Sequence, residues 1–364
     1  MSKIISIGTA QPKYRYQQNE ILDFMKELYH FSENDSKRLS ILYQRSGIVE
    51  RYSAIEDYKL PLGSRTFYEN TLDMEPFPSL EKRMQKYFEA APELAIKAIE
   101  NCIATKILPA EITHLITVSC TGMAAPGLDI MLVKQMGLNT DIHRTSVNFM
   151  GCYAAVHGLK IAHQIAETDR KANVVVVCIE LCSLHFQKEN NMENIASNLL
   201  FADGAAAVLI SSNDSKESGL IINNFYSLLL LEGEADMAWH LSSKGFLMTL
   251  SAYIPKLIES GIATLVEKVV TKMGLSKAEI DHWAIHPGGR KILEVAQKEL
   301  ELEQGALDSS FSVLKHFGNM SSPTILYVIK DIWENKMKVN EEKMLGIAFG
   351  PGLTMETVLL SSSF

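Results

Sequence analysis

The sequence predicts an α/β protein made of two similar halves. Apolar runs alternate with amphipathic stretches along the chain, an order typical of strands that alternate with helices. Two segments also resemble each other, because LPAEITHLITVSCTG and LSKAEIDHWAIHPGG align when Glu111 is matched with Glu279. The simplest account of both observations is two tandem units of one design.

Three apolar runs are predicted to be strands. The clearest is NVVVVCIE at 173–180, a nearly unbroken run of β-branched side chains, which is typical of a strand buried on both faces. THLITVSC at 113–120 and AAAVLISS at 205–212 have a similar character. Between such runs, APELAIKAIENCIA at 91–104 and IPKLIESGIATLVEKVVTKMG at 254–274 have the apolar spacing of helices.

The repeat continues beyond this first pair of segments. Carrying the offset of about 168 residues forward from Cys152 leads beside Asn319, where FGNMSSPTILYVIKDIWEN again predicts a glycine-containing turn followed by a helix. LFADGAAAVLISS and IAFGPGLTMETVLLSS match at an offset shorter by about 20 residues. The polar stretch around residue 215 is the expected boundary. We therefore predict an N-terminal half of residues 1–215 and a C-terminal half of residues 216–364.

Composition narrows the class of protein. The chain has 364 residues, of which 47% are hydrophobic and 21% charged, as in ordinary globular proteins. Acidic residues outnumber basic ones by 43 to 35, which disfavours nucleic acid or a membrane surface as partner. No segment has the roughly 20 apolar residues of a membrane span, and the first apolar patch is too short for a signal peptide.

Cysteine usage points to a reducing compartment. The five cysteines are an odd number and lack CxxC or Cys/His metal spacing. A disulfide framework and a zinc site are therefore not expected. We predict a cytoplasmic protein with no metal site.

Three residues form the candidate catalytic group. In a duplicated α/β chain, Cys152 and Asn319 lie on corresponding turns, and His286 ends the predicted strand HWAIH just before Pro-Gly-Gly. A helix N-terminus and a nearby imidazolium both lower the pKa of a thiol, which would give a thiolate able to attack a thioester. The donors of His286 and Asn319 could together hold an enolate or thioester oxyanion.

Each of these motifs also fits a purely structural role. A free cysteine before a helix is more often a packing residue than a nucleophile, and this reading applies to Cys102, Cys120, Cys178 and Cys182. HPGG fits a strand-ending turn, GNMSS an Asn-containing turn, and FGPG a turn that requires glycine torsions. Only the combination favours catalysis.

The combination resembles a known family. GCYAAVHGLKIA, WAIHPGG, GNMSSPTILYVI and FGPGLTMETVLL occur in this order, and they are similar to the signature motifs of type III polyketide synthases, the chalcone-synthase-like family. The resemblance runs from about Ser36 to the C-terminus and includes the spacing between the motifs.

The resemblance implies a fold and a chemistry. The fold is the thiolase fold, in which two duplicated halves stack as a five-layer αβαβα sandwich, and the protein works as a homodimer. It implies that Cys152 carries the starter acyl group and then the growing chain. It also implies that His286 and Asn319 support loading and malonyl-CoA decarboxylation. No cofactor is implied, because the CoA thioesters are themselves the substrates.

The same comparison addresses the substrate pocket. Phe201 matches the gatekeeping phenylalanine of the family, whereas Met248 stands where a second phenylalanine is usual, which implies a more deformable gate. His185 and Trp239 occupy positions that are Thr and Gly in plant chalcone-forming members, and both would shrink the cavity. The remaining expected substrate-site residues are Cys120, Thr121, Gly350, Pro351 and Gly352.

The CoA entrance departs from the family pattern. Arg38 and Arg45 match basic positions that meet CoA phosphates, but Ile41 replaces a third. This implies weaker CoA binding or starters delivered on an acyl carrier protein. Ala125 stands where plant members have a Met that reaches into the partner's cavity, so completion of the pocket by the second subunit is open.

The expected activity is iterative condensation of malonyl-CoA onto an acyl-CoA starter, then cyclisation to a pyrone or phenolic ring. The bulky pocket predicts short chains, although Met248 and Cys120 could open a path for a longer acyl group. One alternative is a ketoacyl synthase of the fatty-acid-initiation type, which condenses once onto an acyl carrier protein. Another is a non-catalytic partner subunit, against which the retained Cys, His and Asn argue.

Overall fold

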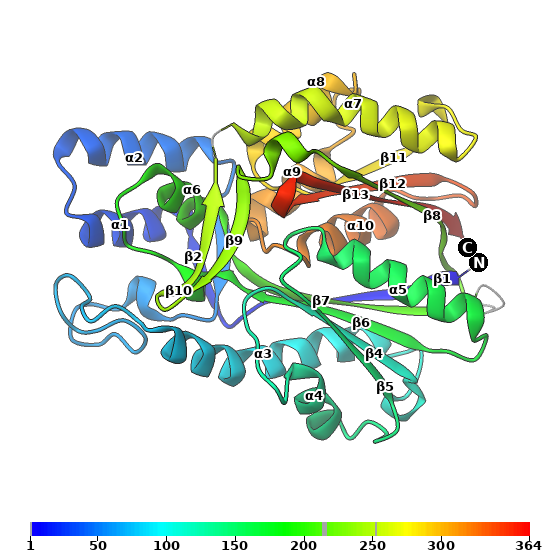
Figure 1. Ribbon diagram of the computed structural model, residues 1–364, viewed down its shortest axis with the longest axis horizontal. Helices are drawn as coiled ribbons and strands as arrows, with labels where there is room; N and C mark the ends of the chain where they lie inside the picture. The colour runs from blue at the N-terminus through cyan, green and yellow to red at the C-terminus, as the bar shows by residue number, and fades with distance from the viewer. Residues whose placement is uncertain (1, 213–216, 252) are drawn as a thin grey trace.

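The chain folds into five layers, in the order helices, sheet, helices, sheet, helices (Figure 1). The computed structural model describes residues 2–212, 217–251 and 253–364. Nine strands of the described chain hydrogen-bond in the order β11-β12-β13-β8-β1-β7-β6-β4-β5. The predicted α/β class and the thiolase-type sandwich are both confirmed by this arrangement.

The first sheet carries the N-terminal half. β6 is buried along its whole length, as the unbroken β-branched run predicted. It pairs in parallel with β4 and antiparallel with β7. The strands of this sheet are β1 (Ser2–Ala10), β7 (Asp203–Ser212), β6 (Val174–Leu181), β4 (His114–Ser119) and β5 (His143–Asn148).

Among the described residues, the second sheet repeats this order with four strands and without a counterpart of β5. Going outward from β8, its order β8-β13-β12-β11 mirrors β1-β7-β6-β4. Its strands are β8 (Gly219–Leu229), β13 (Thr354–Ser363), β12 (Lys343–Gly350) and β11 (His282–Ile285). The 3-10 turn η2 (Pro109–Glu111) precedes β4, and the 3-10 turn η5 (Lys277–Glu279) precedes β11. These two turns are separated by the same offset that was found in the sequence.

The two sheets join at one corner. β1 pairs with β8 through only three residue pairs, the first of which is Ser2 with Ile222. β13 pairs with the other edge of β8, and Ser363 lies opposite Gly219. Both ends of the described chain are therefore bound to the start of β8, at the opposite end of the molecule from α1 and α2 (Figure 1).

The central layer consists of α5 (Ala154–Thr168) and α10 (Thr324–Asn335). The alternation of side chains along a strand places Val174 and Val176 of β6 on this layer, and Val175 and Val177 on the outer one. β12 alternates in the same way between central and outer clusters. The central apolar cluster thus contains residues of both halves.

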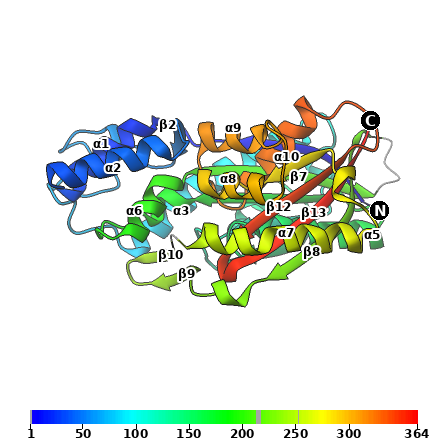
Figure 2. The ribbon, with the colours of Figure 1, turned by 90° about the horizontal axis from the view of Figure 1, so that it is seen from above.

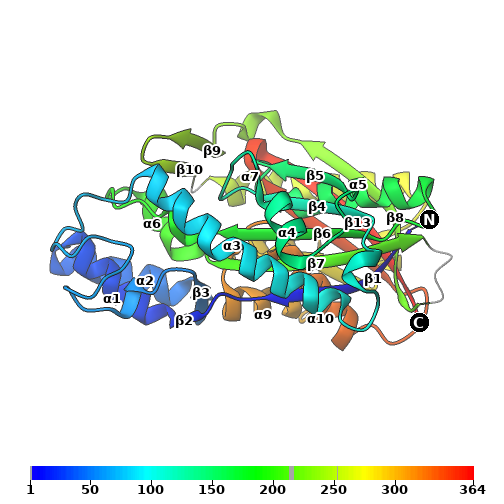
Figure 3. The ribbon, with the colours of Figure 1, turned by 90° about the horizontal axis from the view of Figure 1, so that it is seen from below.

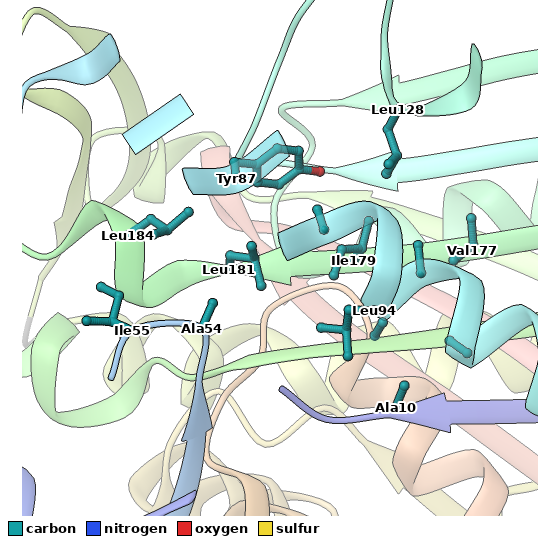
Figure 4. Packing of buried hydrophobic residues seen from close by; sticks show 14 of the residues in the cluster. Ala10, Ala54, Ile55, Tyr87, Leu94, Leu128, Val177, Ile179, Leu181 and Leu184 are labelled. Carbon is teal, nitrogen blue, oxygen red and sulfur yellow. The ribbon is translucent and has the colours of Figure 1, made fainter. Parts of the chain in front are cut away.

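The outer layers close the sandwich. α3 (Leu80–Ile103) and α4 (Leu128–Met136) cover the first sheet (Figure 3), and Figure 4 shows Tyr87 and Leu94 of α3 near Ile179 of β6, in the same apolar cluster. α7 (Ile254–Lys272) and α8 (Arg290–Glu299) cover the second sheet, with α9 (Asp308–Phe317) beside them (Figure 2).

Smaller elements gather at the end of the molecule that holds the site. They are α1 (Gln18–Tyr29), α2 (Glu33–Arg45), α6 (Met192–Leu200), the pair β2 (Tyr14–Gln17) and β3 (Glu50–Ser53), and the hairpin β9 (Met237–Ser242) and β10 (Gly245–Leu250). The other 3-10 turns are η1 (Asp57–Lys59), η3 (Cys182–His185), η4 (Leu231–Gly233) and η6 (Pro351–Leu353).

The predicted segments correspond to observed elements with shifted ends. The helix expected over 91–104 is the second part of α3, which begins eleven residues earlier and contains Pro92. The predicted boundary between residues 215 and 216 lies outside the described residues. Within the described part of the chain, no helix is both long and apolar enough to cross a membrane.

Candidate active site

Cys152 lies in the turn between β5 and α5. The preceding residue, Gly151, has a φ of +80°, a left-handed conformation that glycine adopts without steric cost. A Cβ on Gly151 would lie 2.1 Å from Cδ of Pro351. The N–H of Gly151 donates to Sγ of Cys120 at 3.0 Å. These contacts fix the turn that presents the thiol just before the first residue of α5.

His286 follows the last residue of β11. Its backbone N–H donates to the carbonyl of Ile347 at 2.8 Å, which extends the pairing with β12 by one residue. The side chain is 1% exposed, and neither Nδ1 nor Nε2 has a hydrogen-bond partner among the described residues. Burial lowers the pKa of His286 to about 3, so the imidazole is neutral at pH 7.

Asn319 lies in the turn before α10, and its amide is held at both ends. Oδ1 accepts the N–H of Ser321 at 2.8 Å, and Nδ2 donates to the carbonyl of Gly288 at 3.3 Å. The amide nitrogen carries two hydrogens, so one remains for a further acceptor. The backbone of Asn319 also bonds Leu200 and Ala202, which ties this turn of the second half to the first.

The three residues meet in one cavity. Cys152 comes from the first half, His286 and Asn319 from the second, and all three line a space of about 50 Å³. The convergence expected from the repeat is therefore present in the fold.

The thiol differs from the expectation that its pKa would be lowered. Burial raises the pKa of Cys152 to about 12, and hydrogen bonds from Ser321 and Asn319 only partly oppose this. The expected imidazolium is also absent, because His286 is neutral. In this cavity the cost of desolvating a thiolate exceeds the stabilisation by the helix end and the two donors.

A buried carboxyl group lies beside the site. Glu180 on β6 accepts hydrogen bonds from the N–H of Cys120 at 2.9 Å, the hydroxyl of Thr121 at 2.8 Å and the hydroxyl of Ser322 at 2.7 Å. Burial raises the pKa of Glu180 to about 7 despite these donors. Glu180 thus links the loop after β4 to the turn that carries Asn319.

The wall of the cavity is mostly apolar. The lining residues include six of the expected substrate-site residues, which are Cys120, Thr121, Phe201, Trp239, Met248 and Pro351. The carbonyl of Phe201 accepts a hydrogen bond from Arg51 Nη1, which fixes the backbone of the residue expected to be the gate. Met248 has three rotatable bonds, and it is therefore an adaptable wall residue.

His185 lies behind this wall and holds the hairpin in place. Its Nε2 is 2.7 Å from the carbonyl of Thr121, and its Nδ1 accepts the N–H of Phe246 at 3.2 Å. The rings of His185 and Phe246 stack with their centroids 4.4 Å apart. Trp239 Nε1 donates to the carbonyl of Cys120 at 3.0 Å. His185 therefore anchors β10 and does not line the catalytic cavity.

A larger cavity of about 490 Å³ forms the entrance. Leu250, Gly288 and Ile292 line both cavities, so the two are adjacent. Arg45, one of the two residues expected to bind CoA, lines the entrance. The side chain of Arg38 is 81% exposed, outside the entrance wall, and is paired with Asp35 at 3.6 Å.

The remaining expected residues shape the site from outside it. Gly350 packs on Tyr153, because a Cβ there would lie 2.5 Å from the ring. Gly352 has a φ of +71° in the turn after β12, which favours glycine. Ala125 lies in a separate surface cavity beside β5.

Comparisons with known proteins agree with this geometry. The family models for chalcone and stilbene synthases match the chain over residues 1–214 (N-terminal domain) and 224–363 (C-terminal domain). The chain is 31% identical to the alpha-pyrone synthesis polyketide synthase-like Pks18 of Mycobacterium tuberculosis, over 98% of this chain and 90% of that protein. It is 34% identical to type III polyketide synthase A of Arabidopsis thaliana, over 99% of this chain and 92% of that protein.

The chain belongs to the type III polyketide synthases. Two solved structures have the same fold at a TM-score of 0.91: PKS-I of the brown alga Ectocarpus siliculosus, 28% identical, and the C-terminal type III domain of Steely1 from Dictyostelium, 26% identical. The alignments cover 100% of this chain, with 98% and 99% of the respective chains. This type III polyketide synthase is therefore an acyltransferase that makes polyketides by condensation of CoA thioesters.

Some residues of this synthase's site were missed by sequence reasoning. Ser321 lines the cavity and bonds Cys152, and its φ of +58° is unusual for a residue with a side chain. Its position two residues after Asn319 could have indicated it. Glu180 could have been found as the acidic residue that ends an otherwise apolar strand. Arg290 and Lys291, at the entrance, directly follow HPGG.

Proposed function

We propose that Cys152 carries the starter acyl group and then the growing chain of this type III polyketide synthase. The supporting observation is that Cys152, His286 and Asn319 line one cavity, which lies next to the larger entrance cavity. Loading is an acyl transfer, in which the sulfur of Cys152 attacks the starter thioester and CoA leaves as its thiol. The proton that Cys152 loses moves through the neutral imidazole of His286 to the departing CoA sulfur.

His286 and Asn319 have a second role in this proposal. A neutral imidazole with one N–H, and the amide N–H of Asn319 that bonds Cys152, supply two donors for an oxyanion. Malonyl-CoA loses CO2, and the resulting enolate oxygen accepts from these donors. The enolate carbon then attacks the thioester on Cys152, so a carbon–carbon bond forms and the carbon–sulfur bond breaks. The extended chain, now on CoA, returns to Cys152 for the next round.

We propose short products, cyclised to a pyrone or phenolic ring. The narrow cavity and the bulk of Trp239, which lines it, support a small number of extensions. Movement of Met248 beside Cys120 is the route by which a longer acyl group would fit. The chemistry needs no cofactor beyond the CoA thioesters of the starter and extender.

The test is direct. The protein is incubated with malonyl-CoA and a panel of acyl-CoA starters, and products are identified by mass spectrometry. We expect released tri- or tetraketides. Products made only of many extension units would contradict the small cavity, and a β-ketoacyl chain left on a carrier protein would contradict release by cyclisation.

The Cys152→Ala variant tests the nucleophile. We expect product formation to fall below detection, whereas Cys178→Ala, a buried cysteine outside the cavity, is the matched control and retains activity. Unchanged activity of Cys152→Ala would refute the assignment.

We also propose that the protein is a homodimer. β5 is the edge strand of the sheet, and its residues are mostly exposed. An exposed edge is a template for pairing with another chain. Beside it, Met123 and Ile130 are 43% and 42% exposed and line one surface cavity with residues of β5. Light scattering during gel filtration should give twice the mass of the chain, and a monomer at micromolar concentration would contradict this.

Two further proposals concern supply and compartment. We propose that starters arrive on an acyl carrier protein as well as on CoA. Ile41, an exposed apolar residue on α2 close to Arg45, offers an apolar contact for such a carrier in place of a cation for CoA phosphates. The rate of product formation with the same acyl group on CoA and on the carrier protein tests this proposal. We place the protein in the cytoplasm, where its thiol would stay reduced, and cell fractionation tests that location.

A further inference from the structure

A third cavity continues the path beyond the catalytic residues. It measures about 40 Å³, and it shares Cys182, Phe201, Trp239 and Met248 with the catalytic cavity but no residue with the entrance. The catalytic cavity therefore borders both the entrance and this third cavity, and different residues of α6 line the two. We call the third cavity the polar chamber.

The direction of chain growth decides what reaches the polar chamber. In the proposed function, each condensation leaves the newest carbonyl next to the sulfur of Cys152. The far end of the starter is then the part of the chain most distant from the sulfur. Because CoA occupies the entrance side, the far end of the starter points towards the wall shared with the polar chamber.

The polar chamber differs in chemistry from the apolar cavity before it. α6 presents Asn194, Ser197 and Asn198 to it, positions that lie on one face of a helix. Ile195 and Leu199, on the other face, are buried in the apolar cluster around α3. The helix thus turns its polar face towards the substrate path and not towards solvent.

Hydrogen-bonding capacity remains unused in the polar chamber. Oγ of Ser197 is buried and has no partner among the described residues. The hydrogen bonds recorded for the side-chain nitrogens of Asn194 and Asn198 are donated to Glu189, Tyr29 and Gln187, and within the described chain the two amide oxygens accept none. The chamber therefore offers one hydroxyl and two acceptors.

The positive charge in the polar chamber, on Arg51, already has hydrogen-bond partners within the protein. Arg51 donates through Nε to Oε1 of Gln18 at 3.0 Å and through Nη1 to the carbonyl of Phe201. Asp203 lies close enough to act on Arg51 electrostatically. A neutral group that both donates and accepts fits the remaining partners better than a carboxylate does.

We propose that the polar chamber binds a hydroxyl group at the far end of the starter, so that the preferred substrates are hydroxyacyl-CoA thioesters. This inference rests on the proposed function. A hydroxyl can donate to an amide oxygen of α6 and exchange a hydrogen bond with Ser197, whereas a methyl group would leave these buried groups without partners. Movement of Met248 opens the wall for the chain end.

The experiment compares starters that differ only at the chain end. Initial rates with malonyl-CoA are measured for ω-hydroxyhexanoyl-CoA and heptanoyl-CoA, and for the shorter pair ω-hydroxybutanoyl-CoA and pentanoyl-CoA. We expect the hydroxyl starter to have the higher kcat/KM in at least one pair. The Ser197→Ala variant should reduce that preference about tenfold, and its melting temperature should stay unchanged because the hydroxyl has no partner in the protein.

The control is Ser260→Ala, a change of the same kind at an exposed serine on α7, which should leave the preference as in the parent protein. Equal or better use of the methyl-ended starter in both pairs overturns the inference, and so does an unchanged preference in Ser197→Ala. The absence of any malonyl-dependent product from every starter would instead refute the proposed function.

Discussion

The thiol of Cys152 and the imidazole of His286 are both neutral because both are desolvated. Burial is the largest cause of each pKa shift, and the apolar cavity wall supplies little to solvate an ion. Ionic charge in this site is therefore expected to form only when a thioester arrives to receive it. This arrangement favours reaction with bound substrate over reaction with solvent.

Gly151 is the residue where a small change should have a large effect. The Gly151→Ala variant would combine a strained φ of +80° with a Cβ only 2.1 Å from Pro351. We expect a loss of more than about 2 kcal/mol in unfolding free energy and a large loss of activity, because the turn that presents Cys152 must move. Chemical denaturation measures the loss of unfolding free energy, and the product assay measures the loss of activity.

Gly137→Ala is the matched control. Gly137 also has a positive φ, +64°, but no atom lies within 4 Å of a Cβ built there. Only the backbone cost of roughly 1 kcal/mol should remain, with normal activity. Equal losses in the two variants would show that the contact with Pro351 is unimportant.

His185 gives the protein a pH-dependent stability. Burial lowers its pKa to about 3, below the unfolded value of roughly 6.5. Between these values the unfolded chain binds more protons than the folded one. The contribution of His185 is therefore complete above pH 6.5 and is lost, at about 1.4 kcal/mol per pH unit, as the pH falls towards 3.

The His185→Gln variant tests this contribution. Glutamine can still donate to Thr121 and accept from Phe246, but it does not titrate. We expect the fall in unfolding free energy between pH 6 and 4, measured by urea titration, to be shallower by about one proton. Parallel curves for the variant and the parent protein would contradict the expectation.

Residue identities were easier to predict than residue environments. Cys152, His286 and Asn319 could be found because their motifs recur at corresponding places in a repeated chain. The pKa direction of Cys152 could not be found, because it depends on how completely three separate segments exclude water. The anchoring role of His185 depends on a carbonyl 64 residues away in sequence, to which no local pattern points.

At the scale of elements, the β9–β10 hairpin sets the depth of the catalytic cavity. Trp239 contributes a wall between the cavity and the polar chamber, and its Nε1 is bonded to Cys120. The Trp239→Ala variant removes most of this wall. We expect a shift of the product distribution towards chains with additional extension units, measured by mass spectrometry.

Leu241 provides the control on the same strand. It is 59% exposed and lies two residues beyond Trp239, outside the cavity wall. Leu241→Ala should leave the product distribution unchanged. A Trp239→Ala enzyme that makes only the parent products would show that another residue limits chain length.

The sequence predicted the existence of elements better than their ends. The helix over 91–104 was predicted from its apolar spacing alone. In the structure α3 begins at Leu80, after Ser79 caps it through the N–H of Lys82, so Pro92 lies in the interior. Apolar spacing shows that a helix is present but does not mark the capping residue that begins it.

At the scale of the whole molecule, the central layer joins the two halves into one cooperative unit. The apolar cluster around α5 and α10 contains side chains from strands of both sheets. Unfolding one half would expose the apolar surface of the other. We therefore expect one calorimetric transition, with equal calorimetric and van't Hoff enthalpies per cooperative unit.

Two separate transitions would contradict this expectation. A core substitution in the central layer, Leu326→Ala, should lower the single melting temperature. Leu326 is fully buried, and such substitutions cost about 2–5 kcal/mol. If Leu326→Ala lowered the stability of only the C-terminal half, the halves would be independent domains.

The duplication could be predicted from the residues, whereas the number of layers could not. The match of Glu111 with Glu279 reflects the two equivalent 3-10 turns η2 and η5. How the repeated units pack depends on which strand faces meet α5 and α10, and apolar runs such as 173–180 are buried on both faces. The five-layer stack was therefore implied by the family resemblance and not by periodicity.

The attachment of both chain ends to β8 has a consequence for engineering. Ser2 and Ser363 pair with residues at the start of the same strand, at the opposite end of the molecule from α1 and α2 (Figure 1). A tag, a surface anchor or a second enzyme fused to either end would leave the entrance unobstructed. The same geometry would allow a short peptide to link the two ends, giving a circularised enzyme with its substrate path intact.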